Sequence, residues 1–69
     1  MFKEYDVVRA RYNLSTNVPK YSKGVVLIIF EKTSIAYEVE FVDDLGNTID
    51  LLTVKQEDIE KDIGTLLEP

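Results

Sequence analysis

The chain has 69 residues and a net charge of −5, and it contains no cysteine and no histidine. One domain fits this length, and a hydrophobic content of 45% argues against disorder. Because the thiol nucleophile, the usual general base at neutral pH and the usual zinc ligands are missing, we expect no enzyme, no catalytic residue, no metal site and no cofactor.

The N-terminal segment Tyr5–Tyr12 is predicted to be the first strand, and Val8, Ala10 and Tyr12 form its more apolar face. The residues before it lack the basic and apolar regions of a signal peptide. The longest apolar run, residues 25–30, is far shorter than the roughly 20 residues that a membrane-spanning helix needs. We therefore expect a cytoplasmic protein without a membrane segment.

Asn13–Lys23 is predicted to be a loop, because asparagine, serine and proline recur through it. It is long for a hairpin connection, and long loops in small domains are often functional. Tyr21 is the best candidate for an exposed contact, since tyrosine is favoured in binding hot spots, and Val18 would add apolar contact. The alternative is that Val18 and Tyr21 only cover one end of the fold.

Val25–Phe30 is a continuous apolar run whose length and β-branched content favour a central strand that extends to about Lys32. A short turn over residues 32–34 follows. Ala36–Asp43 then alternates, with Tyr37, Val39 and Phe41 on one side and Glu38 and Glu40 on the other. This alternation predicts a strand with one buried face and one solvent-exposed acidic face.

The remaining elements are shorter. Asp43–Asn47 is read as a hairpin turn rather than a calcium loop, because Leu45 occupies a ligand position. Thr48–Val54 is predicted to be the fourth strand, where Leu51–Leu52 interrupts the alternation and suggests a bulge or a strand covered on both sides. A short helical or 3₁₀ turn is expected near Glu57–Glu60, with room for a short last strand.

Four or five short strands and one long early loop predict an all-β fold, a small antiparallel barrel whose closure hides strand edges. We expect a single domain over residues 4–63 and a C-terminal tail over residues 64–69. The apolar run Val25–Phe30 would favour aggregation if its edges were left open.

Several segments together resemble a family of small bacterial single-domain proteins of unknown function with an SH3-like barrel. They are Tyr5–Val8, Lys23–Val26, Ala36–Asp43, Leu51–Val54 and Glu57–Ile59, and the resemblance spans about residues 4 to 60. The chain departs from the family pattern at Pro19–Lys23, where glycines are expected. The resemblance implies an SH3-like barrel in a bacterial cytoplasm, transfers no catalytic residue, and suggests by analogy a partner protein encoded beside another gene, such as an antitoxin or immunity protein.

Charge is unevenly distributed along the chain, at +3 over residues 1–30 and −8 over residues 31–69. The leading hypothesis is a protein-interaction module that binds a basic partner, a neutralised toxin or enzyme, through acidic side chains and the loop. Its predicted contact residues are Val18, Tyr21, Glu38, Glu40, Asp43, Asp44 and Asp50. Glu38 and Glu40 could also meet Asp50 across a strand pair, but solvated carboxylates on an exposed face are the favoured interpretation.

Two alternatives use other features of the sequence. Self-association as a homo-oligomeric scaffold would use the apolar run Val25–Phe30 and any free strand edges. An RNA- or ribosome-associated barrel would use Arg9, Arg11, Lys20 and Lys23, but the net negative charge makes nucleic-acid binding the weaker hypothesis.

Overall fold

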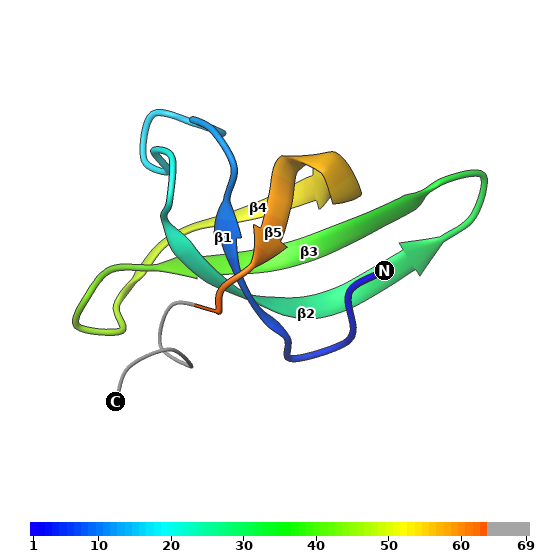
Figure 1. The fold of residues 1–69 in the computed structure, drawn as a ribbon, viewed down its shortest axis with the longest axis horizontal. Coiled ribbons are helices and arrows are strands. Elements are labelled where there is room, and N and C mark those ends of the chain that lie inside the picture. The colour runs from blue at the N-terminus through cyan, green and yellow to red at the C-terminus, as the bar shows by residue number, and fades with distance from the viewer. Residues whose placement is uncertain (64–69) are drawn as a thin grey trace.

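The computed structural model describes residues 1–63, which form one antiparallel sheet and one 3₁₀ turn (Figure 1). The elements are β1 (Val7–Ala10), β2 (Lys23–Glu31), β3 (Ile35–Val42), β4 (Thr48–Lys55), the 3₁₀ turn η1 (Gln56–Asp58) and β5 (Ile59–Lys61). The strand order is β4-β3-β2-β1-β5. The predicted all-β class is thereby confirmed, together with the number of strands and the 3₁₀ turn near the C-terminus. The sheet is open, with β4 and β5 at its edges, so no hydrogen-bonded ladder within residues 1–63 closes it into the predicted barrel.

The long β2–β3 pair runs across the molecule, and β1 and β5 cross over it (Figure 1). η1 joins the two edge strands, so the edges are adjacent in sequence although no ladder pairs them. The tail that was predicted over residues 64–69 lies outside the described residues. Between residues 1 and 63 no helix is both long and apolar enough to cross a membrane.

The core lies on one face of the sheet, and β3 shows the predicted alternation. Tyr37, Val39 and Phe41 are fully buried, whereas Glu38 and Glu40 are only partly covered. The other buried side chains come from every remaining strand and from the long loop: Val8, Ala10, Val18, Val26, Val54 and Ile59. A core assembled from all these elements explains how a chain without disulfides buries a continuous apolar cluster.

β2 and β3 approach each other closely at Gly24, which stands opposite Phe41. A Cβ atom at Gly24 would lie 2.7 Å from Val39 Cγ1 and 2.9 Å from Phe41 Cδ1. Only glycine leaves room for these two side chains, so Gly24 permits the packing of the β3 core residues against β2.

The irregularity in β4 is not where the leucine pair suggested it. Leu51 and Leu52 pair in register with Glu40 and Val39, so that one leucine points away from the core and the other packs against it. The register shifts instead at Ile49, between the pairs Phe41–Asp50 and Val42–Thr48. A second shift lies in β2 between Val26 and Ile28. Both are β-bulges, which bend the strands and change the face of the residues that follow.

β1 is shorter than the predicted Tyr5–Tyr12. At its start, the N–H of Asp6 donates to the carbonyl of Lys3 (3.0 Å) and closes a turn in which Tyr5 has a φ of 70°. At its end, the Tyr12 hydroxyl donates to Asp58, and the side chain stays exposed instead of joining the core. The expected apolar face of this strand is therefore correct for Val8 and Ala10 and wrong for Tyr12.

Candidate interaction surfaces

The side of β2, β3 and β4 that faces away from the core is here called the outer face. Side chains at paired positions of antiparallel strands project to the same side of a sheet. One row of the register therefore places Val25, Glu40 and Leu51 together, and the next places Ile28, Glu38 and Thr53 together. A third row contains Phe30, Ala36 and Lys55.

Large apolar side chains on the outer face are left exposed. Ile28 is 48% exposed, Phe30 42% and Leu51 51%. They stand on the first and last of three adjacent strands, with Glu38 and Glu40 between them. Single exposed apolar residues are common on protein surfaces, but neighbouring ones on a regular sheet face are typical of interaction sites.

Glu38 and Glu40 are oriented by threonines of the neighbouring strand. The Thr53 hydroxyl donates to Glu38 Oε1 (2.7 Å), and the Thr48 hydroxyl donates to Glu40 Oε2. Neither hydrogen bond removes the negative charge, and both hold the carboxylates among the exposed apolar residues. The two glutamates therefore lie on one solvent-facing side of β3, as predicted.

Asp43 and Asp44 lie in the β3–β4 hairpin, where they have different roles. Asp43 Oδ1 accepts hydrogen bonds from the N–H groups of Leu45 and Asn47, both at 2.9 Å. The bond from the Asn47 backbone is the main reason why the pKa of Asp43 is lowered. Asp44 is exposed beside it. Asp43 thus stabilises the turn, and Asp44 is the more accessible charge.

Asp50 does not meet Glu38 and Glu40, which the sequence had left possible. The bulge at Ile49 adds one residue to β4, so that Asp50 stands opposite Phe41 rather than Glu40. Its carboxylate accepts hydrogen bonds from the Ser15 hydroxyl (3.1 Å) and the Leu51 N–H (2.9 Å). Asp50 therefore connects β4 to the long loop on the opposite side of the sheet.

Val18 is also wrong as a contact residue, because its side chain is fully buried. Its carbonyl accepts from the Leu14 N–H (2.9 Å), and its N–H donates to the Ser15 carbonyl (3.1 Å). This tight turn folds the loop back so that Val18 enters the core. The alternative that Val18 covers one end of the fold is the correct one.

Tyr21 is 60% exposed, as predicted, but its neighbours are cations rather than acids. Its ring centroid lies 5.4 Å from Arg9 Cζ and 5.0 Å from Lys20 Nζ. Both distances are within the range of cation–π attraction. Tyr21 therefore belongs to a different surface from Glu38 and Glu40.

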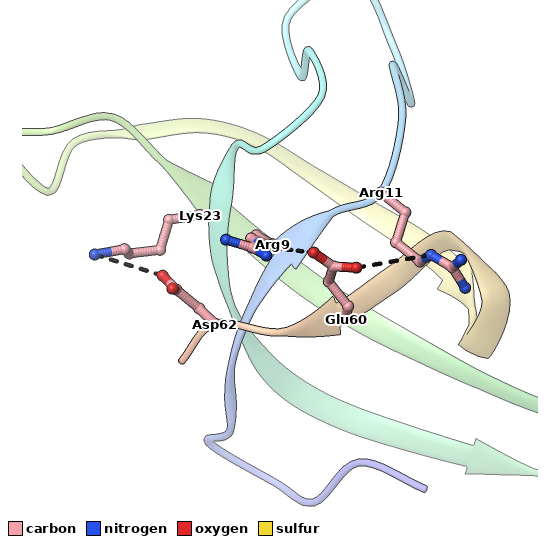
Figure 2. A network of polar contacts seen from close by, with 5 residues as sticks. All are labelled: Arg9, Arg11, Lys23, Glu60 and Asp62. Carbon is pink, nitrogen blue, oxygen red and sulfur yellow. Dashed lines mark hydrogen bonds and ion pairs between the residues drawn. The ribbon is translucent and has the colours of Figure 1, made fainter. Parts of the chain in front are cut away.

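This second surface is here called the cationic corner, and it consists of Arg9, Arg11, Lys20, Tyr21 and Lys23. Figure 2 shows three of its cations beside two acids of the C-terminal segment: Glu60 contacts Arg9 at 2.5 Å and Arg11 at 3.8 Å, and Asp62 contacts Lys23 at 3.7 Å. The hydrogen bond to Glu60 is the main reason why the pKa of Arg9 is raised.

Sequence reasoning missed the exposed apolar residues of the outer face, because a run such as Val25–Phe30 reads as wholly buried. Strand register would have separated Ile28 and Phe30 from the core, but that register depends on a bulge that the run does not signal. It also missed the pairing of Arg9 with Glu60, which lie 51 residues apart. No group of three or more acids within residues 1–63 is arranged to hold a metal ion.

Comparison with known proteins places the chain in a family. The model of a family described as a domain of unknown function (DUF4926) matches residues 4–61. Neither a curated protein nor a solved structure matches significantly. The matched region contains all five strands and η1 and nearly all of the described residues. The chain therefore belongs to the DUF4926 family.

Proposed function

We propose that the protein is a non-catalytic interaction module that binds a basic protein partner through its outer face. The observation that carries this proposal is the exposure of Ile28, Phe30 and Leu51 around Glu38 and Glu40. Apolar side chains supply the area that is removed from water on binding, and the carboxylates favour a partner whose rim carries lysine or arginine.

The threonine hydrogen bonds support this role. Because Glu38 and Glu40 are held in place before binding, little side-chain entropy is lost when a partner cation reaches them. Asp44 extends the negative potential toward the hairpin and would steer the partner during encounter. Asp43 serves the hairpin itself, and Asp50 and Val18 are not part of the proposed contact.

The finer part of the proposal concerns the biological setting. The resemblance to small bacterial proteins with an SH3-like barrel supports, by analogy with antitoxins and immunity proteins, a small acidic cytoplasmic domain that neutralises a basic toxin or enzyme encoded nearby. This part rests on the resemblance and on the charge of −5. It predicts one stoichiometric protein partner rather than a broad set of ligands.

The test begins with a tagged copy expressed at native level and with the identification of a stoichiometric co-purifying protein. Binding of that protein is then measured for Leu51→Asp and for Leu45→Asp, a matched leucine that is 86% exposed in the hairpin. We expect Leu51→Asp to weaken binding by about tenfold or more, as a hot-spot residue would, and Leu45→Asp to leave it unchanged. Equal effects of the two variants would contradict the assignment of the outer face.

Charge is tested separately with the double variant Glu38→Lys/Glu40→Lys. We expect slower association and a weaker dependence of the on-rate on salt. The control is Glu4→Lys/Glu57→Lys, which changes net charge by the same amount at two exposed positions away from the outer face. Unchanged on-rates in the first variant, or the same loss in both, would count against an acidic docking face.

A further inference from the structure

The backbone at Tyr21 has a left-handed conformation that residues other than glycine rarely adopt. The N–H of Ser22 donates to the Pro19 carbonyl (3.1 Å), which makes Tyr21 the third residue of a four-residue turn, and its φ is 74°. Glycine normally occupies this position in a turn of this kind. Two hydrogen bonds to β1 hold the segment: Tyr21 N–H to Ala10 O (2.8 Å) and Ala10 N–H to Ser22 O (2.9 Å).

Strained backbone conformations of this kind are concentrated at functional sites, so the Tyr21 side chain is a candidate for a binding contact. The Tyr21 ring is exposed, and Arg9 and Lys20 lie within cation–π distance of it. Tyrosine and arginine are among the residues enriched in binding hot spots, and a ring fixed among cations offers both apolar area and charge. The cationic corner is therefore preorganised rather than a chance cluster of lysines and arginines.

The corner already holds carboxylates of its own chain. Glu60 reaches both Arg9 and Arg11, and Asp62 reaches Lys23 (Figure 2). Glu60 and Asp62 are two residues apart, which is the spacing that puts side chains on the same face of an extended strand. Three cations of the corner contact these two carboxylates, and Lys20 lies instead against the Tyr21 ring. Within the corner the cations therefore outnumber these carboxylates, and positive charge is left in excess.

We propose that the cationic corner is a second interaction surface, which binds a short acidic segment of another protein in an extended conformation. The excess charge and the Tyr21 ring select for a segment with carboxylates at alternate positions, the pattern that Glu60 and Asp62 already show. A long polyanion such as RNA fits less well, because the corner is small and the chain as a whole carries −5. This surface is separate from the outer face and opposite to it in charge.

The proposal is tested by NMR titration of the whole chain with a synthetic peptide of alternating glutamate and threonine. We expect shifts at Arg9, Arg11, Lys20 and Tyr21. Lys20→Gln/Arg11→Gln should weaken binding by about fivefold or more, a loss typical of hot-spot residues, whereas Lys3→Gln/Lys32→Gln removes two exposed lysines elsewhere and should have little effect. Equal losses of peptide affinity in the two double variants would show that the peptide responds only to the net charge of the protein, and would overturn the proposal.

Tyr21→Gly removes the ring in a conformation that glycine adopts freely, so the fold is kept while the binding surface is lost. We expect this variant to bind the peptide more weakly although its spectrum remains that of a folded protein. Unchanged binding would show that the ring is not used. Absence of shifts with the peptide, or tighter binding of an oligothymidylate of equal charge, would overturn the proposal, the latter in favour of nucleic acid. These outcomes do not depend on the proposed function, because the peptide test concerns the cationic corner. It would stand even if no partner were found for the outer face.

Discussion

Tyr5 lies two residues before β1, and Tyr21 lies two residues before β2. Each is the third residue of a four-residue turn, with a φ of 70° or 74°, and each is exposed. A left-handed backbone costs a residue other than glycine about 1–2 kcal/mol. Hydrogen bonds to neighbouring strands hold both turns in this conformation despite its cost. The Tyr5 N–H donates to Val26 O (2.7 Å), and the Tyr21 N–H donates to Ala10 O (2.8 Å).

This strain can be measured by comparing two variants at one position. Tyr21→Gly and Tyr21→Ala both remove the ring and its cation–π contacts, but only alanine keeps the backbone strain. We expect the glycine variant to be more stable than the alanine variant by about 1 kcal/mol in urea unfolding, because the strain outweighs the greater freedom of unfolded glycine. Equal stability, or a more stable alanine variant, would show that this turn is not strained.

Asp43 gives the hairpin a dependence on pH. Because hydrogen bonds to its carboxylate lower the pKa of Asp43 in the folded state, its contribution to stability is present above the ordinary pKa and is lost as the pH falls through the lowered pKa. Asp43→Asn keeps an acceptor oxygen but does not titrate, so the loss of stability on acidification below about pH 4 should become smaller.

The measurement is the urea midpoint followed from neutral to acid pH. Asp44→Asn serves as the control, since its side chain is exposed and makes no hydrogen bond within residues 1–63. If both asparagine variants change the acid dependence equally, the hydrogen bonds to Asp43 are not its source.

At the scale of elements, the long loop belongs to the core through Val18. A buried valine truncated to alanine loses apolar contacts and leaves a cavity. We expect Val18→Ala to lower the free energy of unfolding by about 2 kcal/mol, although the residue lies in a loop. Val7→Ala, the same change at a strand residue that is 42% exposed, should cost much less.

Urea unfolding of the two variants shows whether the long loop packs on the core through Val18 or lies outside it. A smaller cost for Val18→Ala than for Val7→Ala would mean that the loop does not pack on the core in solution. The comparison separates burial from secondary structure, because the buried valine lies in the irregular segment and the exposed one lies in β1.

Strands were predictable where a local pattern decides them. The alternation Tyr37–Phe41 located β3 to within one residue at each end, and acids before Ile59 indicated the 3₁₀ turn. The leucine pair suggested a bulge in β4, but neither its position at Ile49 nor the bulge in β2 was predictable, because each depends on how two strands pair. One extra residue at Ile49 moved Asp50 to the core side and Leu51 to the outer face. This register shift separates Asp50 from Glu38 and Glu40.

At the scale of the whole molecule, the outer face combines exposed apolar residues with two charges that restrain their association. When two copies meet through this face, Glu38 and Glu40 of each face a like-charged surface. We expect the protein to stay monomeric at micromolar concentration and Glu38→Gln/Glu40→Gln to self-associate, because glutamine removes the repulsion and leaves Ile28, Phe30 and Leu51 exposed.

Sedimentation equilibrium over a range of concentrations tests this expectation. Glu4→Gln/Glu57→Gln reduces the net charge equally and should remain monomeric, which separates a local effect from a general loss of solubility. A wild-type chain that already forms a stable dimer would favour the homo-oligomeric scaffold over the interaction module.

The position of β1 in the sheet has a consequence for synthesis. β1 pairs with β2 on one side and with β5 on the other, and the pair Val8–Lys61 joins opposite ends of the described chain. A ribosome releases β1 first and β5 last among these strands. Until β5 follows, one edge of the nascent sheet stays open beside Val7 and Val8. A nascent chain that has emerged only through β4 therefore lacks the strand that pairs with β1 in the complete sheet.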